Sequence, residues 1–193
     1  MTTLAIAASP ARIRSSAVYR VLLALAGSWL VAGLAQVEVR LPFTPVPVTG
    51  QTLGVLLVGA GLGPGLGALS VGLYLAQGAV GLPFFSGGAG GVSFLGAAAA
   101  TGGYLWGFLL AATVVGFLAR RGWDRTPGRA VAAMLLGEAV IYAVGLPWLM
   151  GTVDVGLARA ISLGFTPFVA GDLLKLLIAA ALVPAAWRVV PRR

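Results

Sequence analysis

The sequence predicts an all-α integral membrane protein with six transmembrane helices in one bundle. Of its 193 residues, 59% are apolar and 9% are charged, whereas about 25% are charged in an average soluble domain. From Leu41 to Ala119 the chain contains no Asp, Glu, Lys or Arg. A spanning helix needs ~20 predominantly apolar residues, so the chain is long enough for one bundle of this size.

The residue types exclude several function classes. The chain has no cysteine and no histidine, which rules out disulfides, zinc and haem sites of the usual kinds, and catalysis by His or Cys. We therefore expect no metal site, no cofactor and no enzyme activity. The sequence has no GxxxxGK[ST] loop and is not expected to hydrolyse ATP by itself.

The basic residues indicate topology rather than nucleic-acid binding. The net charge is +8, but most basic residues lie at the ends of apolar runs, where they act as topology signals and lipid head-group contacts. The three clusters are Arg12, Arg14 and Arg20; Arg120, Arg121, Arg125 and Arg129; and Arg188, Arg192 and Arg193. The positive-inside rule places all three clusters in the cytoplasm, which requires an even number of spans between them.

Residues 1–17 are predicted to form a cytoplasmic lead, and residues 18–190 a single membrane domain. Within the uncharged stretch, proline and glycine mark the turns at 42–47, 61–65, 81–83 and 86–91. The predicted spans are 21–36, 49–62, 66–82, 103–119, 130–150 and 165–187. The second is short for a crossing, but charge parity requires it, and tilting or local thinning of the bilayer can accommodate it. Both termini are then cytoplasmic, and the loops 37–48, 83–102 and 151–166 lie outside.

Asp172 and Lys175 are the first candidates for function. Residues three apart lie on one face of a helix, and this pair falls near the outer end of the last predicted span. Placing one charge in the membrane costs about 2.5–3.5 kcal/mol on insertion scales, and such residues are usually functional. The alternative is a structural ion pair that locks this helix against its neighbours. Glu138, the other charge within a predicted span, is either a structural partner of a backbone donor or helix dipole, or a proton-carrying group.

Further candidates surround the same outer layer of the bundle. An amide, a phenol and several aromatic rings could complete a site for a small amphipathic molecule with amide-like and acidic groups. The glycine-rich stretch 86–91 offers backbone N–H groups and room for a ligand, although it could also be only a flexible turn. These candidates are Gln51, Tyr104, Phe43, Ser86, Gly88 and Ala89.

Small residues repeat at spacing four on the first span, at Ala24, Ser28 and Ala32. Such a stripe allows another helix to approach closely. The partner helix could belong to the same bundle or to another protein.

Four motifs are similar to those of a known family. They are PFTPVPVTGQTLGVLLVGAGLGPGLGALSVGLYL at Pro42 to Leu75, GLPFFSGGAGG at Gly81 to Gly91, TGGYLWGF at Thr101 to Phe108 and GDLLK at Gly171 to Lys175. From about Leu22 onward, the chain resembles the BioY family, the biotin-binding S components of energy-coupling-factor (ECF) vitamin transporters.

The resemblance implies a six-helix bundle in the bacterial cytoplasmic membrane that binds biotin near the outer face and is closed by the first loop. It implies release of biotin inward through a transmembrane T subunit and two ATPases. The family's D-x-x-K motif falls on Asp172 and Lys175, its glutamine on Gln51 and its GGY tyrosine on Tyr104. Its GG-x-GG loop falls on 87–91, and its T-subunit docking stripe on Ala24, Ser28 and Ala32.

The chain departs from the family pattern at three places. Ala89 and Leu105 stand where some members carry a polar residue and an arginine, and Ala99-Ala100 replaces a common Gly-Pro. The expected function is high-affinity biotin binding and uptake as the subunit of an ECF transporter. The alternative is a stand-alone biotin carrier or facilitator without ATPase partners, which could be a homo-oligomer. An S component for another vitamin is disfavoured by the motifs.

Overall fold

The computed structural model describes residues 3–9 and 16–190, which are mostly helical. The helices are α1 (Leu4–Ala8), α2 (Ala17–Ala35), α3 (Gln51–Ala79), α4 (Gly102–Arg120), α5 (Pro127–Val153), α6 (Leu157–Gly164) and α7 (Val169–Val189). Two short strands, β1 (Glu38–Val39) and β2 (Val48–Thr49), form an antiparallel pair. Two 3₁₀ turns, η1 (Ser86–Gly88) and η2 (Val92–Leu95), lie between α3 and α4.

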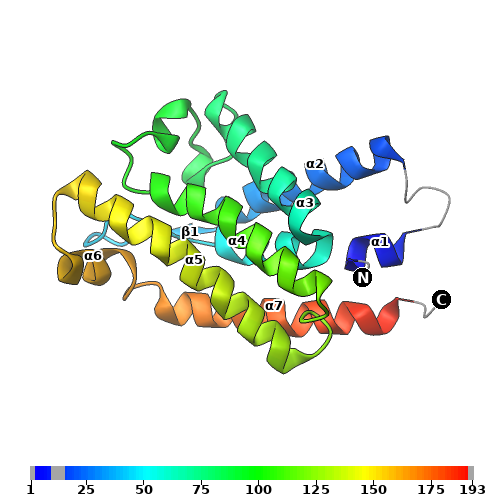
Figure 1. Cartoon of the computed structure of the whole chain (residues 1–193). Helices are drawn as coiled ribbons and strands as arrows, with labels where there is room; N and C mark the ends of the chain where they lie inside the picture. The colour runs from blue at the N-terminus through cyan, green and yellow to red at the C-terminus, as the bar shows by residue number, and fades with distance from the viewer. Residues whose placement is uncertain (1–2, 10–15, 191–193) are drawn as a thin grey trace.

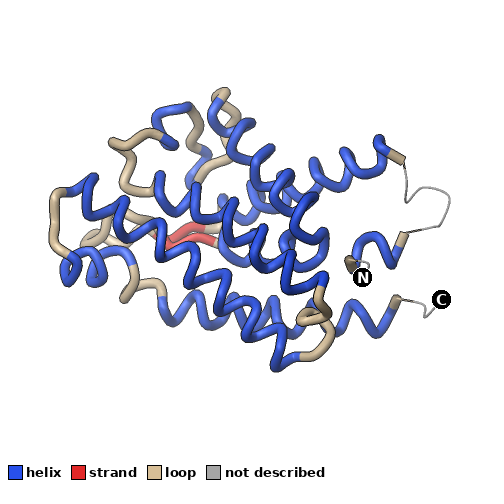
Figure 2. The backbone as a smooth tube through the Cα atoms, in the orientation of Figure 1, coloured by secondary structure: helices blue, strands red, loops and turns tan. Residues whose placement is uncertain are grey.

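The long helices form one elongated bundle with two different ends (Figure 1). At one end lie α6 and the connections that contain the strands, shown in red in Figure 2. At the other end lie α1, the end of α7 and the connection between α4 and α5. Among the described residues, five helices are long and apolar enough to cross a membrane, namely α2, α3, α4, α5 and α7. The prediction of a helical membrane protein is therefore confirmed at this level.

Helix α3 is broken at Gly63. The backbone there has φ 81° and ψ −178°, a conformation that favours glycine over all other residues, and Pro64 follows it without a backbone donor. The two segments fold back on each other. At their contact, a Cβ added at Gly67 would lie 3.1 Å from the Cα of Gly59. This break falls within the predicted turn at 61–65, between the two predicted spans 49–62 and 66–82.

Small residues bring the central helices together. A Cβ added at Gly59 of α3 would lie 2.8 Å from the carbonyl oxygen of Ala112 on α4, so only glycine permits this approach of the backbones. Buried side chains from α3, α4, α5 and α7 fill the interior below the loops, including Leu56, Val115, Met134 and Leu176. Packing through small residues is the usual means by which membrane helices associate.

Several connections are more regular than the sequence predicted. The predicted loop 37–48 contains β1, which pairs with β2. The pairing gives hydrogen-bond partners to the backbone of this Pro-rich loop. The predicted loop 151–166 contains α6, and α7 begins at Val169 rather than at 165. Within the predicted lead 1–17, Leu4–Ala8 is helical. Four arginines used for the topology prediction, Arg12, Arg14, Arg192 and Arg193, lie outside the described residues.

The stripe of small residues on α2 faces inward. Ala24 and Ser28 are fully buried and Ala32 is 7% exposed. Ser28 Oγ accepts a hydrogen bond of 3.2 Å from Gln77 Nε2 of α3, so the stripe packs against a helix of the same chain. Of the two partners left open by the sequence, the structure shows the one inside the bundle. Their burial does not support the prediction that these three residues form an exposed docking surface.

Candidate ligand-binding site

Asp172 and Lys175 form a buried ion pair in the first turns of α7. Lys175 Nζ lies 2.6 Å from Asp172 Oδ1, and the two side chains are only 13% and 10% exposed. The ammonium also donates a hydrogen bond of 2.8 Å to the carbonyl oxygen of Thr49 on β2. Asp172 lies in the first turn of α7, where the helix dipole favours a negative charge. The pair therefore connects α7 to the strand that precedes α3.

Two further side chains hold the carboxylate of Asp172. The hydroxyl of Tyr142 on α5 donates a hydrogen bond to Oδ2, and Thr52 Oγ1 at the start of α3 lies 3.4 Å from Oδ1. A carboxylate that accepts several hydrogen bonds in a buried site has a fixed orientation. Three helices, α3, α5 and α7, thus converge on one acceptor group.

Gln51 lies at the start of α3, next to this pair, and is 6% exposed. Its Oε1 accepts a hydrogen bond of 2.7 Å from Thr49 Oγ1, and its Nε2 donates to the hydroxyl of Tyr74 on the second segment of α3. Both ends of the amide therefore have partners, which fixes its orientation at the cavity wall.

Tyr104 near the start of α4 is 7% exposed. Its hydroxyl donates a hydrogen bond of 2.9 Å to the carbonyl oxygen of Gly164, the last residue of α6. Its ring and that of Tyr142 form a T-shaped pair with a centroid distance of 6.2 Å, and Tyr142 packs in turn against Phe165. Tyr104 thus links the connection between α5 and α7 to the site.

These side chains surround a small inner cavity of about 50 Å³. One water molecule occupies about 30 Å³ in the liquid, so the inner cavity in this structure is far too small for a bicyclic ligand with an alkyl chain. Its wall contains both polar groups and apolar groups such as Leu105, Phe108 and Phe168. The inner cavity brings together Asp172, Lys175, Gln51 and Tyr104.

A second, outer cavity of about 490 Å³ adjoins the first. Pro47 and Thr101 line both cavities. The outer wall contains Ser86 and Ala89 of the glycine-rich connection, Thr44 of the Pro-rich loop and Arg40, which follows β1. Two of the residues predicted from the glycine-rich stretch therefore line a different cavity from the Asp172 pair.

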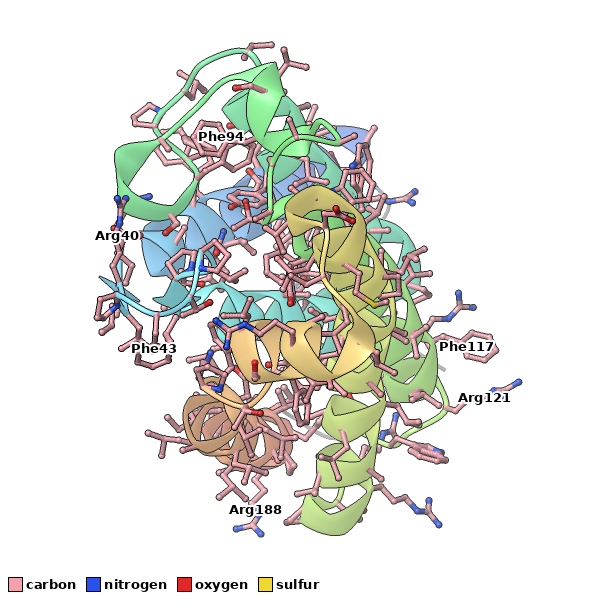
Figure 3. The ribbon with its side chains drawn as sticks, turned by 90° about the vertical axis from the view of Figure 1, so that its left-hand side faces the viewer. Arg40, Phe43, Phe94, Phe117, Arg121 and Arg188 are labelled. Carbon is pink, nitrogen blue, oxygen red and sulfur yellow. The ribbon has the colours of Figure 1, made fainter. Side chains whose placement is uncertain are left out.

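Two predicted residues line neither cavity. Phe43 is 59% exposed and lies at the edge of the end view in Figure 3. Gly88 is exposed in η1, with φ 72°. Neither residue contacts the space that the other predicted residues surround.

Sequence reasoning missed three contributors: Tyr142, Tyr74 and Thr52. Tyr142 lies one helical turn from Glu138, and this spacing places both on the same face of α5. That relationship was the available signal for Tyr142. Nothing in the sequence marks Tyr74 as the partner of Gln51, because the two lie on segments that meet only after the break at Gly63.

Glu138 lies one turn from Tyr142 towards the other end of α5. It is 6% exposed, and neither of its carboxylate oxygens has a hydrogen-bond partner among the described residues. The charged groups that act on it are Asp172 and Lys175. Glu138 therefore lies beneath the inner cavity as a buried acid without a direct partner.

Apolar helices of membrane-spanning length around a buried polar site define a multi-pass membrane protein with a candidate ligand-binding site. The model of the BioY family matches residues 6–192. The chain belongs to the BioY family.

Similar proteins agree with this assignment. The chain is 37% identical over 169 residues to the biotin transporter BioY of Rhizobium etli, covering 84% of this chain and 89% of that protein. It is 39% identical over 142 residues to the biotin transporter BioY of Thermotoga maritima, covering 74% and 81%. It resembles the crystal structure of the S-component for biotin from an ECF-type ABC transporter with a TM-score of 0.77 and 27% identity, covering 89% of this chain and 92% of that one. The prediction of a transport protein rather than an enzyme is confirmed.

Proposed function

We propose that this chain binds biotin with high affinity and takes it up as the substrate-binding subunit of an ECF-type transporter. The observation that carries the proposal is the buried Asp172–Lys175 pair, which is 2.6 Å apart and held by α3, α5 and α7, in a chain of the BioY family. Biotin is the cargo, and no cofactor enters the proposed function.

The chemistry of the inner cavity suits the polar head of biotin. The ureido group offers two N–H donors and one carbonyl acceptor, and the fused ring is apolar. Asp172 accepts hydrogen bonds and Lys175 donates them, while Phe108 and Phe168 supply apolar surface. Charge-assisted hydrogen bonds are about twice as strong as neutral ones, which favours tight binding once the cavity opens.

The proposed topology has six spans with both termini in the cytoplasm. The two segments of α3, on either side of Gly63, are then separate spans, which their close approach at Gly59 and Gly67 supports. Helix α4 ends at Arg120, and this end lies at the same end of the bundle as α1 and the end of α7 (Figure 1), in agreement with the positive-inside rule. Residues 18–190 are then one membrane domain, and the site lies near the outer face of the bacterial cytoplasmic membrane.

The proposed partners are membrane lipids, a transmembrane T subunit and two ATPase subunits. The alternative remains a stand-alone biotin carrier, and Glu138 is the observation that favours it. A buried acid without a direct partner beneath the site is the type of group that proton-coupled carriers use.

Two measurements test the proposed function. Isothermal titration of the purified protein in detergent should show tight biotin binding, and absence of binding would overturn the proposal. Biotin uptake should then be measured in cells lacking other biotin transporters, with and without co-expressed T and ATPase subunits. Uptake only with these partners supports the subunit, whereas uptake by this chain alone supports the carrier.

A further inference from the structure

The two cavities divide the site into an inner and an outer compartment. Pro47 and Thr101 line both compartments, and the outer one is roughly ten times larger, at about 490 Å³ against 50 Å³. A ligand with a compact polar head and a chain ending in a carboxylate has two ends of different chemistry. The shared wall offers a path for such a ligand to occupy both compartments when the inner one opens.

The cation of the inner compartment is already engaged. Lys175 Nζ lies 2.6 Å from Asp172 Oδ1 and 2.8 Å from the carbonyl oxygen of Thr49. A carboxylate placed here would have to compete with Asp172 for the ammonium, and it would meet the negative charge of Asp172 at close range. The inner compartment therefore suits a neutral group that both donates and accepts hydrogen bonds.

The outer compartment has a cation with free donors. Arg40 lines it and forms an ion pair with Glu38 through Nε at 2.9 Å. Among the described residues this is the one hydrogen bond of its guanidinium, so its two Nη groups remain available to a second carboxylate. Its side chain is 72% exposed, and its two Nη groups form the side of the fork that binds carboxylates in a bidentate manner. Of the residues that line this compartment, Arg40 alone carries a charge.

The structure also fixes the place of Arg40 relative to the inner compartment. Arg40 follows β1, and β1 pairs with β2, whose Thr49 accepts the hydrogen bond from Lys175. Glu38 of β1 also accepts a hydrogen bond from Ser86 Oγ, and this bond joins the hairpin to η1. Figure 3 shows Arg40 where the hairpin and this turn meet. One hairpin therefore presents Thr49 to the inner compartment and Arg40 to the outer one.

We propose that Arg40 binds the carboxylate of the ligand in the outer compartment while Asp172 and Lys175 bind its polar head in the inner one. This inference rests on the proposed function, with biotin as the ligand. Arg40 is then the residue that distinguishes biotin from analogues whose carboxylate is blocked. Glu38 keeps its hydrogen bond from Nε and orients the guanidinium towards the compartment.

The test compares biotin with biotin methyl ester, which keeps the head and chain but has no charge. Affinities are measured by titration in detergent for the wild type, Arg40→Gln and the matched control Arg159→Gln, which removes an exposed arginine of α6 that lines neither compartment. The wild type should prefer biotin to the ester by about tenfold or more, equivalent to about 1.4 kcal/mol. Arg40→Gln should abolish most of this preference by weakening biotin alone, and Arg159→Gln should leave it intact.

Other outcomes are equally informative. If Arg40→Gln weakens both compounds equally, or neither, the inference is wrong. If Lys175→Ala rather than Arg40→Gln removes the preference, the carboxylate binds in the inner compartment and the inference is again wrong. Failure of the wild type to bind either compound would instead overturn the proposed function.

Discussion

The hydroxyl of Tyr142 on α5 donates a hydrogen bond to Asp172 Oδ2 on α7. Lys175 and Thr52 contact the other oxygen, Oδ1. The two oxygens of Asp172 thus have different partners from different helices. A ligand that forms hydrogen bonds with this carboxylate meets an acceptor whose orientation the fold has already fixed.

Tyr142→Phe should therefore weaken biotin binding while keeping the ring that packs on Tyr104 and Phe165. Loss of a hydrogen bond to a buried charged group costs about 1–3 kcal/mol, so we expect a fall in affinity of roughly tenfold, measured by titration. Unchanged affinity would show that the hydroxyl does not orient Asp172 for binding. Tyr19→Phe, on α2 and away from both cavities, serves as the control.

Asp172→Asn and Lys175→Ala should each weaken biotin binding by more than about tenfold, because each removes one charge of a buried pair and leaves the other without compensation. Titration in detergent measures this effect, and Asp154→Asn, an exposed carboxylate at the same end, is the matched control. Wild-type affinity in either variant would contradict the assignment of the inner cavity as the binding site.

Glu138→Gln should preserve biotin binding and uptake driven by T and ATPase subunits. The substitution keeps the shape of the side chain, and Glu138 makes no hydrogen bond that would be lost among the described residues. Uptake assays in cells with these subunits test the prediction. Loss of uptake there, with binding retained, would give Glu138 a part in transport and strengthen the proton-coupled alternative.

Asp124, in the connection between α4 and α5, should make stability depend on pH. It is 2% exposed, and burial raises the pKa of its carboxyl above the ordinary value of 3.8, although the 2.5 Å hydrogen bond from Trp187 Nε1 and the charge of Arg125 lower it. A raised pKa means that the folded state binds the proton more tightly than the unfolded state does. The stabilisation is therefore complete below pH ~4 and is lost as the pH rises through the folded pKa.

Asp124→Asn removes this titration and keeps an acceptor for Trp187. Relative to the wild type, the variant should gain thermal stability as the pH rises from about 4 to 7, as measured by melting temperatures in detergent. An offset between the two proteins that is the same at every pH would contradict the prediction. Arg20→Gln, an exposed residue of α2, controls for a general change of surface charge.

The sequence predicts well those features that depend on neighbouring residues. Gly63 followed by Pro64 identifies the turn in α3, since the positive φ and the missing donor are local properties. The spacing of Asp172 and Lys175 likewise predicts their pairing within one helix. The helical membrane class could also be predicted, because it depends on composition and not on how the helices pack.

Features that depend on how helices rotate against one another were not predictable. The repeat of Ala24, Ser28 and Ala32 indicates a close helix contact but does not say which helix makes it, and the structure shows α3. The contact of Tyr74 with Gln51 depends on how the two segments of α3 face each other. The spacing from Glu138 places Tyr142 on a face of α5, but its contact with Asp172 depends on how α5 and α7 face each other. Arg40 is likewise connected to the site only by the pairing of β1 with β2.

The hydrogen bond from Lys175 to the Thr49 carbonyl gives the hairpin a mechanical role. If the hairpin moves away to admit a ligand, the ammonium of Lys175 loses an acceptor, so this contact opposes opening together with the hydrogen bond from Ser86 to Glu38. A ligand that reaches the Asp172–Lys175 pair would compete with the Thr49 carbonyl for the ammonium of Lys175 and then serve as its acceptor. Binding of a ligand to this pair would therefore exchange the hydrogen bond between Lys175 and Thr49 for one between Lys175 and the ligand.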